Sequence, residues 1–149
     1  MCAVEIFYAL LGLALTVLIF WLNRSLYRGG ATTLEAVCYL VAVPALVIGW
    51  YFNIAYMREY GSEAGWWHWT TLLFVNPASA SGGQDLIIAN LILFPLWTMV
   101  DGRRLGMRAP WLYFVMSLVT SYAFAIALFM ALRERQLRAS APPATRAAG

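Results

Sequence analysis

Four apolar runs dominate the sequence, and they restrict its fold more than any other feature. They cover roughly Ala3 to Leu22, Glu35 to Met57, Leu86 to Val100 and Trp111 to Leu132. A helix needs about 20 apolar residues to cross the hydrocarbon core of a bilayer, where only a helix or a closed barrel satisfies its own backbone groups. The sequence therefore predicts an all-α integral membrane bundle of about four transmembrane helices, with residues 1–138 as one domain.

The composition agrees with a surface that faces lipid. Hydrophobic residues make up 62% of the chain and charged residues only 11%, whereas soluble domains contain roughly 25% charged residues. All ten basic residues are arginines, and they form short clusters beside the apolar runs. A nucleic-acid-binding protein carries a continuous basic stripe instead. We therefore expect membrane lipids and no nucleic acid as partners, with a homo-oligomer or a larger membrane complex as an open alternative.

The second run has clear boundary signals. Thr32 or Thr33 is placed to cap its first turn. Pro44 lies inside the run, and in a membrane bundle a kink is expected there rather than a break. The C-terminal residues 139–149 are rich in Ala and Pro, and we predict a disordered tail.

The segment from Arg58 to Gly83 is the least regular part of the chain. Trp66, Trp67 and Trp69 fall within four residues, a pattern typical of an interfacial aromatic belt. The dipeptide at 76–77 and the Ser/Gly-rich run at 79–83 are expected to break any helix. The sequence predicts an interfacial or re-entrant segment between the second and third membrane helices, and the third begins near Asp85.

Small residues mark where helices could approach closely. Ala45 and Gly49 are four residues apart in the second run, and Ser117, Ser121 and Ala125 recur at the same interval in the fourth. Small residues at this spacing are enriched at helix interfaces in membranes. The fourth run, from Trp111 to Leu132, is the least interrupted of all, and we predict one continuous spanning helix there.

A small polar site is the main functional hypothesis from the residues. Ionisable groups at membrane depth are costly to bury, and Asp85, Glu5 and Glu35 lie nearest to the spans. The candidate polar site consists of Asp85, Asn53, Asn90 and His68. The alternatives are structural: Asp85 as a helix cap, Asn53 in an interhelical hydrogen bond, and the lone histidine as an interfacial residue.

Arginines and tryptophans near the ends of the runs have two interpretations. Arg103, Arg104 and Arg108 form a compact basic turn that anchors the topology or binds an anionic lipid headgroup. The predicted interfacial anchors are Trp66, Trp67, Trp69 and Trp111. With four crossings the arginines divide equally, five to each side of the membrane, so their number does not decide the orientation.

Several short motifs resemble a known family. They are Gly49 to Ile54, Asn76 to Ser79, Asp85 to Ala89, Asp101 to Met107, and Leu132 to Arg135. Over roughly Leu46 to Leu137 the chain resembles the bacterial membrane family catalogued as domain of unknown function 2834. Two positions depart from that pattern, Ala127 in place of a proline and Asp101 in place of a glutamate. The resemblance implies a membrane fold and no particular reaction, and we expect a multi-pass protein of the bacterial inner membrane.

The sequence contains no strong catalytic motif. A Gly-rich phosphate loop, a metal-spaced histidine set and a Ser-His-Asp arrangement are all missing, so we predict no metal and no cofactor. This favours a non-enzymatic accessory subunit or lipid-binding bundle. The first alternative is a small membrane enzyme acting on an isoprenoid or carotenoid-like lipid, with a desolvated carboxylic acid as proton donor. The second is a transporter or channel subunit, because Pro44 and Pro95 interrupt two of the runs.

Overall fold

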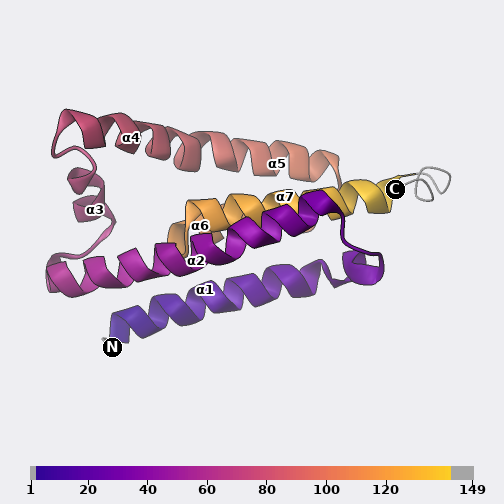
Figure 1. Cartoon of the computed structure of the whole chain (residues 1–149), viewed down its shortest axis with the longest axis horizontal. Coiled ribbons are helices and arrows are strands. Elements are labelled where there is room, and N and C mark those ends of the chain that lie inside the picture. Colours follow the sequence, from indigo (N-terminus) through magenta and orange to yellow (C-terminus); the bar gives the residue numbers. More distant parts are fainter. Residues whose placement is uncertain (1–2, 142–149) are drawn as a thin grey trace.

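The computed structural model describes the backbone of residues 3–141, which form an all-helical bundle without strands (Figure 1). The α-helices are α1 (Ala3–Leu22), α2 (Thr33–Tyr60), α3 (Trp66–Leu72), α4 (Pro77–Ile88), α5 (Phe94–Arg104), α6 (Trp111–Val119) and α7 (Tyr122–Ser140). Two short 3-10 helices are η1 (Arg24–Arg28) and η2 (Gly61–Glu63), and a π-helix, η3 (Ala89–Leu93), joins α4 to α5. Of the predicted disordered tail, residues 142–149 lie outside the described part, while α7 continues to Ser140.

Two helices of the described chain are long and apolar enough to cross a membrane. They are the stretches Thr33–Glu63 and Pro77–Arg104, and a shorter apolar helix covers Ile6–Leu22. The second stretch is one continuous helical rod, α4–η3–α5. A break does occur at the predicted dipeptide 76–77, because α3 ends at Leu72 and α4 begins at Pro77. The predicted break at 79–83 is wrong, since these residues belong to α4. Asn76 caps α4, and its side chain accepts a hydrogen bond from the backbone N–H of Ser79 at 2.9 Å.

The predicted continuous helix from Trp111 to Leu132 is wrong, because the chain reverses direction between α6 and α7. The Tyr113 ring of α6 packs edge-on against the Phe129 ring of α7, 5.2 Å between centroids. Farther along α7, Arg133 pairs with Asp101 near the end of α5, where α6 begins. The two helices are therefore antiparallel and form a helical hairpin, with its reversal at Thr120 and Ser121.

Polar side chains explain why the helix stops at an apolar-looking position. Ser121 is the N-cap of α7, and its hydroxyl accepts from the backbone N–H of Phe124 at 3.4 Å. Thr120 donates its hydroxyl to Met116 O, and Asn53 of α2 donates to Thr120 O at 3.0 Å. Serine and threonine compete with helical backbone bonds in this way. The predicted stripe of Ser117, Ser121 and Ala125 is consequently divided between two helices.

The hairpin is the centre of the bundle. α6 packs against α1 and α5, and α7 packs against α2. The reversal fits between helices because two glycines leave space for it. A Cβ on Gly49 would lie 2.7 Å from Ser121 Cβ, and one on Gly12 would lie 2.8 Å from Thr120 Cγ2. The close approach predicted for Gly49 is thus confirmed.

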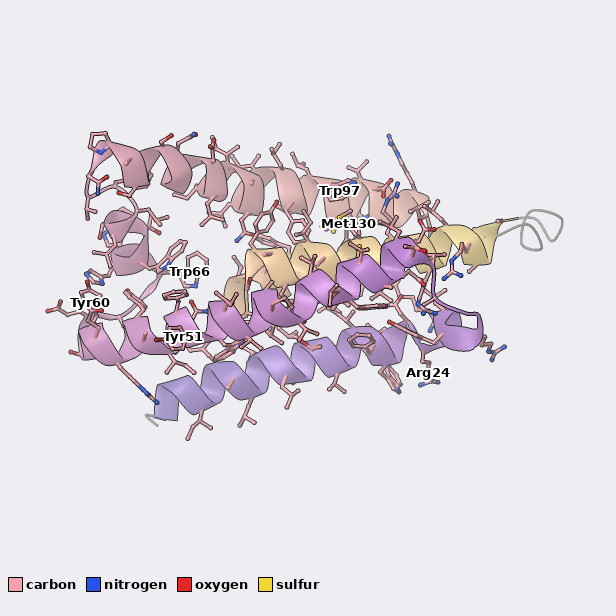
Figure 2. The ribbon with its side chains drawn as sticks, viewed as in Figure 1. Arg24, Tyr51, Tyr60, Trp66, Trp97 and Met130 are labelled. Atoms are coloured by element: carbon pink, nitrogen blue, oxygen red, sulfur yellow. The ribbon has the colours of Figure 1, made fainter. Side chains whose placement is uncertain are left out.

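The outer helices leave large apolar side chains exposed on the surface (Figure 2). On α2, for example, Leu40, Val43 and Val47 are exposed, and buried residues occur only in its first third, at Glu35, Cys38 and Ala42. Thr32 caps this helix, as one of the two predicted caps, and the helix continues through Pro44. The core belongs mainly to α6 and α7, whose buried side chains include Tyr113, Met116, Leu128, Phe129 and Leu132.

Candidate functional site

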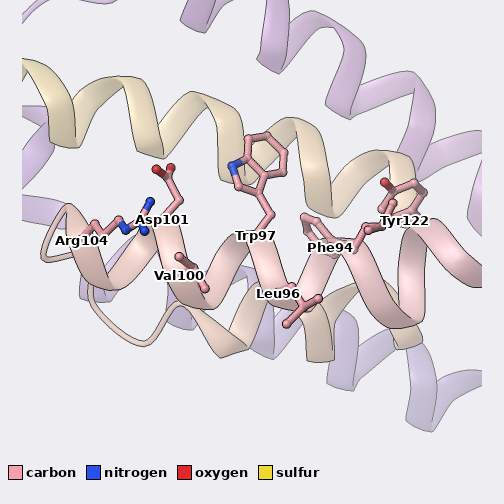
Figure 3. A pocket seen from close by; sticks show the side chains of 8 residues that line it. Phe94, Leu96, Trp97, Val100, Asp101, Arg104 and Tyr122 are labelled. Atoms are coloured by element: carbon pink, nitrogen blue, oxygen red, sulfur yellow. The ribbon is translucent and has the colours of Figure 1, made fainter.

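A groove with a volume of about 670 Å³ runs along α5 (Figure 3). Apolar side chains of α5 line most of it, and Tyr122 closes one end. The lining residues are Leu93, Phe94, Leu96, Trp97, Val100, Asp101, Arg104 and Tyr122. The groove is therefore amphipathic, with its charged residues at one end only.

The helical spacing of the lining residues gives the groove its direction. Leu93, Trp97, Val100 and Arg104 recur every three or four residues and so share one face of the helix. Eleven residues separate the first from the last, or about 16 Å along the axis. That length is roughly half the 30 Å hydrocarbon core, which is the depth of one leaflet. The groove thus offers an apolar stripe of this length that ends at Arg104.

The charges at the polar end favour an anion. Asp101 is already paired with Arg133 of α7, so its negative charge is largely compensated. Arg104 is exposed and forms no ion pair with a described residue. Arg103 is exposed beside it, whereas Arg108 donates to Leu22 O at 3.3 Å and ties the basic turn to the end of α1. Two of the three predicted lipid-contact arginines therefore remain available to a ligand.

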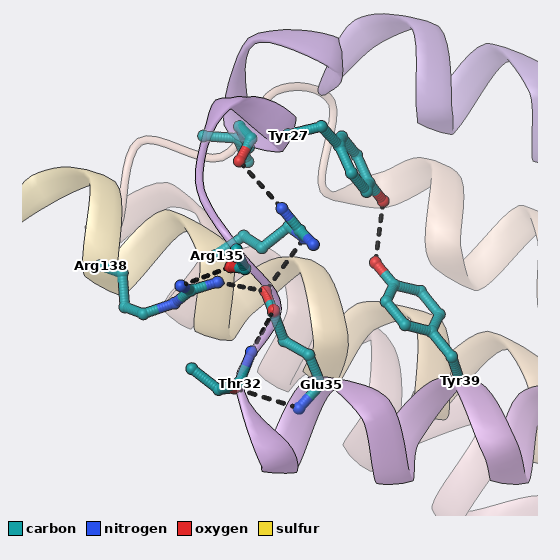
Figure 4. A network of polar contacts seen from close by, with 8 residues as sticks. Tyr27, Thr32, Glu35, Tyr39, Arg135 and Arg138 are labelled. Atoms are coloured by element: carbon teal, nitrogen blue, oxygen red, sulfur yellow. Dashed lines mark hydrogen bonds and ion pairs between the residues drawn. The ribbon is translucent and has the colours of Figure 1, made fainter. Parts of the chain in front are cut away.

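A buried ion network lies at the same end of the bundle (Figure 4). Glu35 is fully buried, and its carboxylate accepts from Arg138 Nη2 at 2.7 Å and lies 3.0 Å from Arg135 Nε. The guanidinium of Arg135 stacks over the Tyr27 ring, 4.1 Å from its centroid. Partial burial raises the pKa of Tyr27, and its hydrogen bond with Tyr39 raises it further. The network holds η1 and the start of α2 against α7.

The second pocket, of about 300 Å³, lies between α2 and α3 at the opposite end. Its lining residues are Phe52, Asn53, Ala55, Tyr56, Glu59, Tyr60, Trp69, Leu72 and Leu73. Tyr56 Oη accepts from Gly65 N–H at 3.0 Å and lies 3.0 Å from His68 Nδ1, so it holds the start of α3 against α2. His68 also packs edge-on against Tyr60, 4.6 Å between ring centroids.

The four residues of the predicted polar site do not form one cluster. Asn53 and Asn90 both bond to the end of α6, the first to Thr120 O at 3.0 Å and the second through Ser117 Oγ at 2.7 Å. His68 instead contacts the tyrosines of α2. Asp85 is exposed in the middle of α4 and bonds to the side chain of Gln84, so it is not the helix cap.

The comparison with protein families agrees with the resemblance found in the sequence. The family described as "Protein of unknown function DUF2834" matches residues 37–135, which is more than half of the chain. The chain belongs to this family. α1 and the first turn of α2 lie before the matched region of the DUF2834 protein. No curated protein and no solved structure matches the chain.

Sequence reasoning missed the acidic and aromatic residues of the second pocket. Tyr56, Glu59 and Tyr60 recur at three- and four-residue intervals near the end of α2, and this spacing was the available signal. It also missed the partners of Glu35, which lie a hundred residues farther along the chain. Within the described part of the DUF2834 protein, no three His, Cys, Asp or Glu residues are grouped to hold a metal ion.

Proposed function

We propose that this DUF2834 protein is an integral membrane, non-enzymatic bundle that binds an anionic phospholipid in the groove along α5. The observation that carries the proposal is the groove itself, an apolar stripe one leaflet long that ends at exposed Arg104. Arginine binds phosphate oxygens through a planar fork of donors. The chain would hold the headgroup phosphate there, with an acyl chain along Val100, Trp97 and Leu93.

A membrane location is supported by the outward faces of three rods. Large apolar side chains are exposed along α1, α2 and α4–η3–α5, at positions including Leu10, Leu13, Val17, Leu40, Val43, Val47, Tyr51, Leu91, Leu93 and Leu96. Monomeric soluble proteins rarely expose contiguous apolar surface on this scale. We propose three membrane crossings by these rods, with the α6–α7 hairpin as a re-entrant element among them.

The hairpin meets the requirement for irregular backbone at membrane depth. Backbone that leaves the helix is tolerated there only where protein or a water-filled cavity surrounds it. Thr120 is buried and its carbonyl accepts from Asn53, while Ser121 caps the returning helix. The re-entrant element we propose is therefore α6–α7, and α3 remains an interfacial helix anchored by Trp66, Trp67 and Trp69.

The hairpin also decides the orientation that we propose. Because α7 returns to the end where α6 began, eight arginines belong to one end: Arg24, Arg28, Arg103, Arg104, Arg108, Arg133, Arg135 and Arg138. Arg58 alone belongs to the other end among the described residues. Arginine-rich loops stay in the cytoplasm, so we propose a cytoplasmic arginine end in a bacterial inner membrane. The equal division of five arginines to each side, expected from the sequence, assumed a fourth crossing between α5 and the C-terminus.

Native mass spectrometry with a defined lipid mixture tests the lipid proposal. The full chain, extracted gently, is exposed to equal amounts of phosphatidylglycerol and phosphatidylcholine, and we expect preferential retention of phosphatidylglycerol. Arg104→Gln should reduce that retention about fivefold, since one charge contact near a surface contributes about 1 kcal/mol. Arg28→Gln is the matched control, because it removes an exposed arginine from the same end outside the groove. Equal retention by Arg104→Gln and Arg28→Gln would contradict the proposal.

A further inference from the structure

The pocket between α2 and α3 differs in chemistry from the groove along α5. Four aromatic side chains line it: Phe52, Tyr56, Tyr60 and Trp69. Glu59 is its one charged lining residue, and no arginine contributes to it. Aromatic faces carry negative electrostatic potential, and together with a carboxylate they attract a cation. The pocket therefore favours a cationic group, in contrast to the anion favoured by the arginine end of the groove along α5.

The size and location of the pocket limit its occupant. Its volume of about 300 Å³ is at the lower end for ligand pockets, so it admits a headgroup rather than a whole lipid. Trp69 belongs to the predicted aromatic belt, where indole rings lie at headgroup level in a membrane. A ligand that reaches this level from the bilayer presents its polar end to Glu59 and Tyr60.

We propose that this pocket binds an alkylammonium group, that of a phosphatidylethanolamine headgroup. The carboxylate of Glu59 neutralises the ammonium charge, and the rings of Tyr60 and Trp69 contact its polarised C–H and N–H groups. Leu72 of α3 and Leu73, which follows this helix, extend the apolar wall toward the glycerol end of the lipid. This inference rests on the proposed membrane location but not on anionic lipid binding along α5.

The closing experiment measures lipid retention from equal amounts of phosphatidylethanolamine and phosphatidylglycerol by native mass spectrometry of the full chain. Glu59→Gln should lower phosphatidylethanolamine retention about fivefold and leave phosphatidylglycerol retention unchanged. Glu63→Gln, an exposed acid of η2 that does not line the pocket, is the matched control and should retain both lipids. Unchanged phosphatidylethanolamine retention in Glu59→Gln would overturn the inference, and so would equal loss of both lipids.

A second pair of variants tests the aromatic ring of Tyr60 separately from its hydroxyl group. Tyr60→Phe keeps the aromatic face and should retain phosphatidylethanolamine as the wild type does. Tyr60→Leu removes the ring, and its retention of phosphatidylethanolamine should fall about threefold. Equal loss in both would overturn the aromatic contribution. Displacement of the lipid by dilute tetramethylammonium chloride would overturn the assignment to a lipid headgroup in favour of a free organic cation. If the wild type retained phosphatidylethanolamine but no phosphatidylglycerol, the proposed groove function would fail while this inference stood.

Discussion

The arginine-rich end of the bundle and its tryptophan-rich end are held together by different interactions. At the arginine end, buried Glu35 joins two arginines of α7, and α5, α6 and α7 meet around the Asp101–Arg133 pair. At the tryptophan end, α3 contributes no buried residue, and α4 contributes only Gly83. Tyr56 accepts a hydrogen bond from Gly65 there and stacks on His68, which packs edge-on against Tyr60.

The two ends therefore differ in rigidity. Buried ion pairs tolerate little rearrangement, because breaking one leaves a desolvated charge. Elements with few buried residues, such as α3 and α4, have little packing to lose when they open locally. The tryptophan end therefore belongs to the low-stability part of the molecule, from which ligand-binding elements are usually drawn.

The sharpest test of the comparison is whether the two ends face different compartments. In a background with Cys2→Ser and Cys38→Ser, single cysteines are introduced as Ser25→Cys, Ser62→Cys and Ser140→Cys, all at exposed positions. A membrane-impermeant maleimide should label Ser62→Cys in intact bacterial spheroplasts and the other two only after permeabilisation. Labelling of Ser140→Cys together with Ser62→Cys would instead indicate a fourth crossing and contradict the hairpin.

The arginine end should respond most strongly to loss of its buried acid. Glu35→Ala leaves Arg135 and Arg138 without their carboxylate, and we expect the free energy of unfolding to fall by about 3–5 kcal/mol. Unfolding in detergent, followed by circular dichroism, measures the change. Glu63→Ala at the exposed tryptophan end should cost less than about 0.5 kcal/mol. Similar losses for the two variants would remove the distinction between the ends.

Two adjacent glycines of α4 give the smallest and most closely matched test. A Cβ on Gly83 would lie 2.7 Å from Leu73 Cβ, whereas one on Gly82 meets nothing within 4 Å. Gly83→Ala should destabilise the fold by about 1–3 kcal/mol through overpacking. Gly82→Ala should stabilise it by about 0.4–1 kcal/mol, because alanine restricts the unfolded chain. Thermal unfolding of both variants measures these changes in stability. A stabilising Gly83→Ala would show that α3 and α4 are not closely packed.

Local patterns predicted the single helices better than their arrangement. The start of α2 was predictable because Thr32 and Glu35 cap it through bonds between residues three apart. The break at Thr120 was not, because its hydroxyl and that of Ser121 hardly change the hydropathy of an apolar run. What stabilises the break is Asn53, 67 residues earlier in the chain.

In the candidate sites, too, features set by neighbouring residues were predictable, whereas contacts between residues far apart in the chain were not. Arg104 was predicted as a lipid contact from its cluster, and its place at the end of an apolar stripe follows from helical spacing alone. The pairing of Asp101 with Arg133, which leaves Arg104 available, could not be read from the chain. Of the predicted polar site of Asp85, Asn53, Asn90 and His68, the two asparagines bond to the end of α6, whereas Asp85 is exposed on α4 and His68 contacts the tyrosines of α2. The bonds of both asparagines join residues far apart in the chain, so local patterns could not predict them.

The reversal at Thr120 and Ser121 has a consequence for biosynthesis. α6 has nine residues, too few for a translocon to recognise as a membrane span, and it leaves the ribosome after all three longer rods. In the membrane arrangement proposed above, the hairpin would therefore enter a gap between helices that are already inserted, where Gly12 and Gly49 leave room for Thr120 and Ser121. In that arrangement, a nascent chain that stalls before Pro110 would leave the proposed membrane helices without the element that joins them, and quality-control proteases would meet loosely associated helices rather than a folded protein.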